Sequence, residues 1–451
     1  MPWPVSQDYN EAVQNPGTSF ADDDLSQAAA VTNALGLPIP RSGNFADVYE
    51  FTRGDARWAV KCFTRPVQGL AERYDAISRG LHEARLPFSI EFKYLRQGVR
   101  VRGDWYPVLK MEWVEGFLLN QFVRDNLERP AVLDALCQIW VRMARRLRQA
   151  EVTHGDLQHG NVLLVPGSKA TSLAVRLIDY DGLWVPELAG VPSGEVGHPS
   201  YQHPQRLREG TYGPEVDRFP LLVVATALRG LIAGGPALWE RYDNGDNLLF
   251  RETDLRDPAG SALFRELWEL PDSQAHALVG HLVDACGQPV EQVPLLDDVM
   301  SEDAVRLLPP ARELWVAATL GALADVTPSA AAGRGAGARA AGEPVGTGEA
   351  AEVVALAEPA PSARGRGWDA EPGGEPEADF GSFDFGEKEV VSRRSRGRRR
   401  RLSATALAWI WVAVVFLALA AVLPLVLRRS AAASSGRAPD AGPGKVDGDG
   451  P

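Results

Sequence analysis

Two neighbouring strings, THGDLQHGNVLL at residues 153–164 and VRLIDYDG at residues 175–182, constrain the fold more than any other part of the chain. The apolar stretch Val162–Val165 predicts a strand, and a turn-rich segment follows it. Ala174–Ile178 then predicts the returning strand. The two strings therefore predict a β-hairpin with polar residues at both of its open ends.

This hairpin would hold three polar side chains around one point. Asp156 and Asn161 precede the hairpin, five residues apart, and Asp179 follows its second strand. A carboxylate can orient or deprotonate a hydroxyl nucleophile, while an amide and a second carboxylate offer oxygen ligands to Mg²⁺. The pattern favours phosphoryl transfer from ATP.

The same residues resemble the catalytic segment of the protein kinase superfamily, in which H-R-D-x-x-x-x-N precedes D-F-G. Further motifs stand in the family's order over roughly residues 38–300. They are Ser42–Tyr49, similar to a degenerate Gly-rich loop; Trp58–Lys61, similar to V-A-I-K; Lys110–Gly116, similar to the hinge; Gly197–Gln205, similar to the bacterial G-T-P-x-Y-x-A-P-E; and Asp217 at the start of an apolar helix, Phe219–Ile232. The chain looks most like bacterial Ser/Thr protein kinases with an HGD-type loop.

This resemblance implies an α+β, two-lobed protein-kinase-like fold. The expected N-lobe spans residues 38–114 and the expected C-lobe spans residues 115–300. An N-terminal extension at 1–37 and a C-terminal extension of the domain at 301–326 would flank the two lobes.

The resemblance also implies roles for single residues. Asp156 would act on the substrate hydroxyl, Lys61 would reach the α- and β-phosphates of ATP, and Asn161 and Asp179 would hold Mg²⁺. The rest of the nucleotide site would comprise Gly43 in the loop, Val48 and Ala59 above the adenine, Met111 as gatekeeper, and the backbone of Glu112 and Val114 in the hinge.

The acid that pairs with the lysine in this family stays open in this sequence. Apolar residues at helical spacing predict a helix over about 70–85, at Leu70, Tyr74, Ile77 and Leu81. The candidate acids on this helix are Glu72, Asp75 and Glu83, and the favoured alignment puts Ala76 where the family usually has Glu.

The chain also departs from the family pattern. Gly155 replaces an arginine that commonly binds an activation-loop phosphate, so phosphate-gated activation is not expected. Gln158 replaces a lysine near the transferred group, where positive charge stabilises the transition state. Asp181 replaces the last glycine of D-F-G and is expected to add a third acid near the metals.

These features leave three functions open. An active protein kinase is favoured, because Lys61, Asp156, Asn161 and Asp179 are all present. A pseudokinase, which binds ATP or partners without phosphotransfer, is supported by the departures. A small-molecule phosphotransferase is the third, disfavoured by the segment 197–205. No sequence feature names the substrate, the activating signal or an oligomeric state.

Composition excludes some classes of partner and chemistry. The net charge of -12 argues against nucleic-acid binding. The three cysteines, Cys62, Cys137 and Cys286, form no metal-binding spacing and are typical of reduced thiols in the cytosol.

The composition changes after Val326. Residues 327–403 are rich in Ala, Gly, Pro and Glu and predict a disordered linker. The linker ends in a basic cluster of seven arginines within residues 393–401. It also contains two Asp-Phe-Gly triplets, at 379–381 and 384–386, which we interpret as solvated linker, with a short docking motif as the alternative.

A membrane helix is predicted at Ala404–Leu427, which carries no charge in 24 residues. As a helix it would span roughly 36 Å, enough for a hydrocarbon core of about 30 Å. The arginine excess on its N-terminal side predicts a cytoplasmic kinase domain and a short extracytoplasmic tail, 428–451. The N-terminus lacks the basic start and apolar run of a signal peptide. We therefore expect a single-pass membrane protein.

Overall fold

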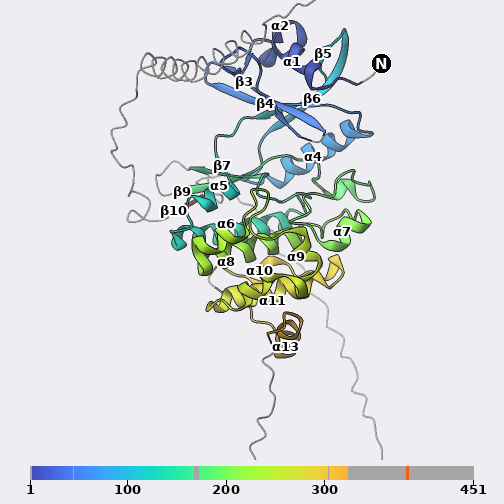
Figure 1. The fold of residues 1–451 in the computed structure, drawn as a ribbon. Coiled ribbons are helices and arrows are strands. Elements are labelled where there is room, and N and C mark those ends of the chain that lie inside the picture. Colours follow the sequence, from blue (N-terminus) through green and yellow to red (C-terminus); the bar gives the residue numbers. More distant parts are fainter. Residues whose placement is uncertain (1–2, 44, 167–171, 303, 323–381, 385–451) are drawn as a thin grey trace, which may run out of the picture. The chain divides into compact units, whose positions relative to one another are not determined.

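The protein is described by a computed structural model that covers residues 3–43, 45–166, 172–302, 304–322 and 382–384. A β-sheet forms the N-terminal region, and the residues after it are mainly helical (Figure 1). The predicted α+β class is confirmed. The predicted membrane helix and tail, and all of the predicted linker except Ser382–Asp384, lie outside the described residues.

The N-terminal sheet is antiparallel, with strand order β1-β3-β4-β6-β5 and β2 paired to β3. Its strands are β1 (Ala29–Ala30), β2 (Arg41–Ser42), β3 (Ala46–Arg53), β4 (Ala56–Phe63), β5 (Phe92–Val101) and β6 (Asp104–Glu112). Side chains alternate between the two faces of a strand. In β4, Lys61 and Phe63 therefore share one face, and Val60 and Cys62 lie on the other.

Residues before the predicted N-lobe pack on the Val60 face of this sheet. They form helices α1 (Ser6–Val13), α2 (Pro16–Ser19) and α3 (Asp23–Ser26), whose apolar residues share a core with the strands. The Tyr9 hydroxyl donates to the Phe63 carbonyl oxygen at 2.6 Å. The buried Lys110 ammonium donates to carboxylates of Asp22 and Asp24, each at 2.7 Å. The N-terminal segment is thus part of the sheet's own packing.

Helix α4 (Leu70–Ala84) follows β4, where a helix over about 70–85 was predicted. The four residues that gave the helical period are all buried: Leu70, Tyr74, Ile77 and Leu81. The Tyr74 ring stacks on Tyr94 of β5, with centroids 5.4 Å apart and planes 12° apart. This prediction is confirmed, and it brings α4 against the sheet.

The predicted hairpin is confirmed in the second sheet, whose order is β10-β9-β8-β7. Strand β8 (Val162–Pro166) pairs with β9 (Ser172–Leu177), and β7 (Phe117–Leu118) lies beside β8. Strand β10 (Ser382–Asp384) comes from the predicted linker and pairs antiparallel with β9, Ser382 opposite Ala174.

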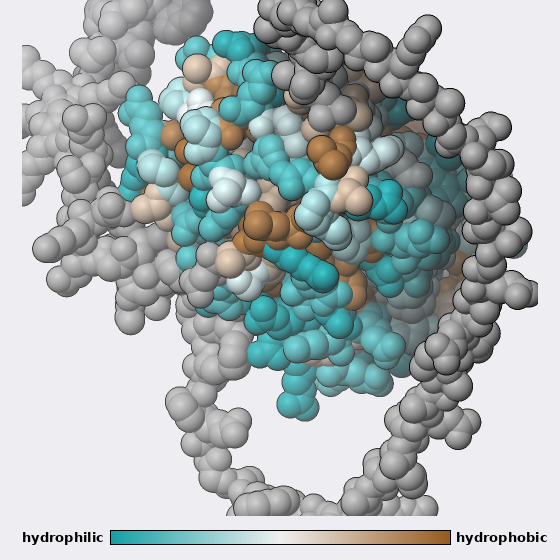
Figure 2. All heavy atoms as spheres, turned by 90° about the horizontal axis from the view of Figure 1, so that it is seen from below, coloured by the Kyte–Doolittle hydropathy of each residue, from teal (hydrophilic) through white to brown (hydrophobic). Residues whose placement is uncertain are grey.

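The remaining helices form the C-terminal part of the described chain. They are α5 (Leu119–Arg124), α6 (Pro130–Gln149), α7 (Pro204–Glu209), α8 (Arg218–Tyr242), α9 (Glu252–Arg256), α10 (Ala262–Trp268), α11 (Ser273–Cys286), α12 (Leu296–Val299) and α13 (Pro310–Thr319). Figure 2 views this region from below: most of the surface is hydrophilic, and hydrophobic groups are confined to small areas.

Helix α8 contains the predicted apolar helix Phe219–Ile232 and extends it. Gly235 interrupts the helix with φ 62° and ψ -158°, and Pro236 follows. Within the described residues, α8 is the one helix long and apolar enough to cross a membrane, but 61% of its apolar window is buried in the protein. Length and composition alone are weak evidence for a membrane span, because the central helix of a packed core meets the same criteria.

Candidate active site

The loop between α6 and β8 is held by Asp217, which immediately precedes α8. The buried Asp217 carboxylate accepts hydrogen bonds from the backbone amides of His154 and Gly155. Burial raises the pKa of Asp217, and the nearby His154 and the two amides oppose this rise. His154 is fully buried, and its Nε2 lies 3.0 Å from the Ile178 carbonyl oxygen. Asp217 thus stands buried at the start of an apolar helix, where the sequence placed it.

Gly155 occupies a position that only glycine fits. Its φ is +77°, and an added Cβ would lie 2.0 Å from the Gly182 carbonyl oxygen. Both the left-handed backbone and the contact exclude a side chain. The loop that carries Asp156 and the segment after β9 touch through their backbones. This contact is a steric reason why glycine, and not the arginine of the resembled family, stands at position 155.

Asp156 and Asn161 meet as the sequence predicts. The Asn161 amide nitrogen donates to the Asp156 carboxylate and to its backbone oxygen, both at 2.9 Å. The carboxylate also accepts from the His198 amide at 2.7 Å and from Gln158 Nε2 at 3.1 Å. The segment that resembles G-T-P-x-Y-x-A-P-E thus closes directly on Asp156.

Lys61 of the N-terminal sheet reaches the segment after β9. Its ammonium lies 2.7 Å from Asp179 Oδ1 and 2.6 Å from Asp181 Oδ2, and the residue is 6% exposed. Burial alone would lower the pKa of Lys61, but Asp179 and Asp181 together raise it. Lys61 is therefore a permanent cation between two carboxylates.

The expectation that an acid of helix α4 pairs with Lys61 is wrong. Glu72 and Asp75 instead pair with Arg96 at 3.5 and 2.9 Å and are exposed. Glu83 lines a cavity at the far end of the helix. The helical period puts all three acids outside the buried face of α4, so none of them can reach a lysine beneath it.

Asp181 takes the place of that acid. Its Oδ2 binds Lys61, and its Oδ1 accepts from the Tyr74 hydroxyl of α4. Both carboxylate oxygens thus have protein partners, and Asp181 shares the Lys61 ammonium with Asp179. Asp179, two residues earlier, has φ +66°, a strained backbone for a residue other than glycine.

The other predicted nucleotide residues line the face of the sheet that carries Lys61. Val48 stands opposite Lys61, and Ala59 stands opposite the buried Met111. Gly43 lies exposed in the turn between β2 and β3. Of the residues predicted to form a hinge, Glu112 ends β6 and Val114 lies in the connection to β7.

The side-chain oxygens of Asn161 and Asp179 are suitable ligands for a magnesium ion. Asn161 uses its nitrogen toward Asp156, which leaves the amide oxygen for a cation. Asp179 gives one oxygen to Lys61, and 46% of its side chain is exposed. Mg²⁺ prefers such oxygen ligands and commonly takes one or two from protein and others from phosphates. Among the described residues, no three His, Cys, Asp or Glu side chains form a metal cage.

Lys61, Asp156, Asp179 and Asp181 form a cluster of ionisable groups, the Lys61 cluster, and Glu195 is a fifth member of it. Burial, followed by repulsion from Asp181 and Asp179, raises the pKa of Glu195 to about 7. The carboxyl is therefore largely protonated in mildly acidic solution. The sequence offered no sign of this, because Glu195 lies outside every motif.

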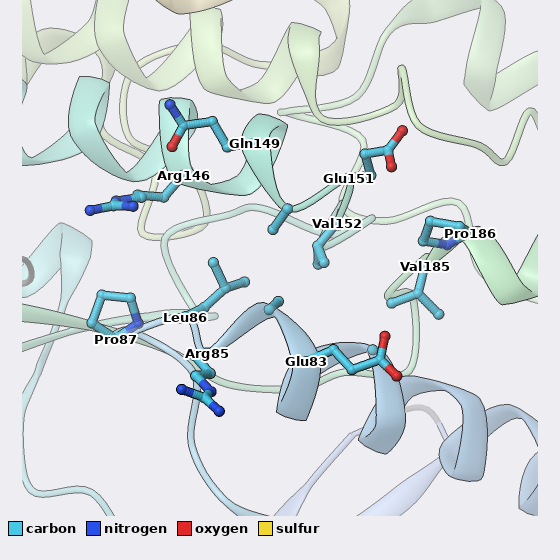
Figure 3. Close-up of a pocket in the computed structure, with 13 residues that line it drawn as sticks. Glu83, Arg85, Leu86, Pro87, Arg146, Gln149, Glu151, Val152, Val185 and Pro186 are labelled. Atoms are coloured by element: carbon cyan, nitrogen blue, oxygen red, sulfur yellow. The ribbon is translucent and has the colours of Figure 1, made fainter. Parts of the chain in front are cut away.

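A cavity of about 730 Å³ lies away from these residues, where α4 and α6 end (Figure 3). Arg146 and Gln149 of α6 line one side, and Glu83 of α4 lines another. None of the predicted catalytic residues contributes to it. Its lining comes from the ends of α4 and α6 and from the segments at 85–87, 150–152 and 185–186. The candidate site is therefore taken to be the cluster around Lys61.

Comparisons with known proteins give no family for the chain. No protein-family model matches the sequence, and no curated protein is significantly similar to it.

Besides Glu195, the sequence alone missed three contributors to the site. Tyr74 was predicted as an apolar core residue, and a buried tyrosine in place of phenylalanine is the signal that a hydroxyl partner lies nearby. Arg73 donates to the Asp181 carbonyl oxygen at 3.0 Å. The His198 amide reaches Asp156 through backbone geometry, which no residue type reveals.

The contact at Gly155 gives a first prediction. Gly155→Ala should lower the free energy of unfolding by at least about 2–3 kcal/mol more than Gly190→Ala, because only Gly155 has backbone atoms in the way. Gly190 is the matched control, since its φ is +78° and nothing lies within 4 Å of its added Cβ. Chemical denaturation measures both; equal losses would contradict the close approach to Gly182.

The raised pKa of Glu195 gives a second prediction. Between about pH 4.5 and pH 7 the folded protein keeps a proton that the unfolded chain releases, so stability falls as pH rises. Glu195→Gln should remove this fall, worth about 1–2 kcal/mol after allowance for partial exposure to solvent. Unfolding measured from pH 4.5 to pH 8 tests it. Parallel pH profiles of wild type and variant would contradict the assignment.

Proposed function

We propose that the chain is an ATP-dependent protein kinase with a two-lobed protein-kinase-like fold, which transfers the γ-phosphate of ATP to Ser or Thr hydroxyls of a protein substrate. The observation that carries the proposal is the meeting of Lys61 and Asp179, which are 118 residues apart in sequence and 2.7 Å apart in space. The Ile178 amide donates to the Asn161 carbonyl oxygen, so this pair lies beside Asp156 and Asn161.

Each residue would have a defined task. Asp156 would accept the proton of the substrate hydroxyl as its oxygen attacks the γ-phosphorus and the bond to ADP breaks. Lys61 would offer its remaining N–H to phosphate oxygens. Mg²⁺, held by Asn161 and Asp179, would neutralise phosphate charge. Val48, Ala59 and Met111 would give the adenine an apolar surface.

One observation favours a pseudokinase as the second candidate. The Asp156 carboxylate already accepts three hydrogen bonds, from His198, Gln158 and Asn161. A general base with occupied oxygens has to release a donor before it can take a proton. Gln158 is also neutral where the resembled family has a lysine. Neither the occupied Asp156 oxygens nor the neutral Gln158 would prevent the protein from binding nucleotide as a scaffold.

We also propose that a membrane helix at Ala404–Leu427 tethers the kinase-like domain. The arginines before it support a cytoplasmic position for that domain, since positive charge is retained on the cytoplasmic side. Arginines at this point would also lie near anionic headgroups, each worth on the order of 1 kcal/mol.

Phosphotransfer from labelled ATP tests the proposed activity. The full-length chain, with Mg²⁺ and casein or itself as acceptor, should incorporate label from the γ-position. Asp156→Asn should reduce the rate by about 100-fold or more, because it removes the proton acceptor. Asp125→Asn, an exposed carboxylate paired with Arg124, is the control and should keep the rate. Incorporation that is absent in wild type, or unchanged in Asp156→Asn, would contradict kinase activity.

A further inference from the structure

Lys61 has an unusual counter-ion for a lysine on a sheet covered by a helix. The residues of α4 that lie buried are apolar or aromatic, and Ala76, at the position of the expected glutamate, is 3% exposed. The carboxylates that reach Lys61 come instead from the segment after β9. Besides Asp179, this segment supplies Asp181, 120 residues away along the chain.

Asp181 has no free oxygen. Oδ2 accepts from Lys61 at 2.6 Å, and Oδ1 accepts from the Tyr74 hydroxyl. The side chain of Asp181 is 13% exposed, whereas that of Asp179 is 46% exposed. Burial and the neighbouring carboxylates raise the pKa of Tyr74 well above its usual value, so its hydroxyl stays a donor. Asp181 is therefore built into the protein, while Asp179 faces the open site.

Helix α4 is joined to the same segment by further contacts. Arg73 donates to the carbonyl oxygens of Asp181, at 3.0 Å, and Leu183, at 3.2 Å, and to the Tyr212 hydroxyl at 2.7 Å. About two turns further along α4, a Cβ on Gly80 would lie 2.6 Å from Val185 Cγ1. The helix thus follows residues 181–185 closely, and a shift of α4 would pull on Asp181.

We propose that Asp181 is the positioning residue of Lys61, and that Tyr74 transmits the position of helix α4 to the nucleotide site through it. The inference rests on the proposed function, since it describes how that site is held together. Helix α4 has no acid of its own that reaches Lys61. It would act on Lys61 through the Tyr74 hydroxyl and through Asp181, which comes from the segment after β9.

The direction of the effect follows from the lysine's donors. An ammonium has three N–H groups, and Asp179 and Asp181 accept two of them. If the Asp179 carboxylate rotates to bind a metal cation, Asp181 still holds Lys61. The other two N–H groups of Lys61 can then donate to the phosphates. If Asp181 instead competed with phosphate, its removal would strengthen nucleotide binding. The two accounts predict opposite signs.

The test measures Mg–ATP affinity of the full-length protein by calorimetry, together with KM and kcat for ATP. Asp181→Asn should weaken affinity about tenfold or more, because a charge-assisted hydrogen bond to Lys61 is lost. Tyr74→Phe should weaken it by about threefold or more and act mainly on KM. Asp75→Asn, on the exposed side of α4 and paired with Arg96, is the control and should stay within about twofold.

A double variant separates positioning from general damage. In an Asp181→Asn background, Tyr74→Phe should add little, because residues that act through one interaction are not additive. Tyr74→Phe keeps the ring that stacks on Tyr94, so it isolates the hydroxyl. Wild-type or tighter affinity in Asp181→Asn and Tyr74→Phe overturns the inference and leaves the kinase proposal intact. A wild-type protein that binds no Mg–ATP overturns both.

Discussion

The buried ammonium of Lys61 is the interaction on which the described structure depends. An isolated charge in a protein interior costs several kcal/mol or more, and an ion pair offsets this only with good geometry and satisfied partners. Here Asp179 and Asp181 lie 2.7 and 2.6 Å from Lys61, and Tyr74 satisfies the second oxygen of Asp181. The N-terminal sheet supplies Lys61, helix α4 supplies Tyr74, and the segment after β9 supplies the two carboxylates. The three elements therefore have to assemble together, because a missing element would leave a buried polar group without its partner.

The loop that carries Asp156 is held by a different kind of constraint. Asp217 binds two of its backbone amides, and Gly155 lets it touch Gly182. These contacts connect the loop to helix α8 on one side and to the Asp179 segment on the other. The two halves of the candidate site are thus joined through backbone atoms.

Local patterns predicted much of this arrangement. The hairpin β8–β9, helix α4 and the approach of Asn161 to Asp156 follow from spacing over short stretches, whereas the position of Asp217 was implied by the resemblance. The counter-ion of Lys61 was missed, because it comes from 120 residues away and the family pattern directs attention to helix acids. Residues 1–37 were predicted only as an N-terminal extension. Their short helical segments do not indicate which surface they pack against, because that surface is formed by strands further along the chain. The steric reason for Gly155 needs the position of Gly182, which no local pattern contains.

The central claim is that Lys61, Asn161 and Asp179 form a Mg–nucleotide site. A structure of the full-length chain with Mg²⁺ and a non-hydrolysable ATP analogue tests it most directly. The account predicts phosphate oxygens within hydrogen-bonding distance of Lys61 Nζ, and a cation on the side-chain oxygens of Asn161 and Asp179. Nucleotide bound elsewhere, for example in the cavity between α4 and α6, with the Lys61 cluster unchanged, would contradict it.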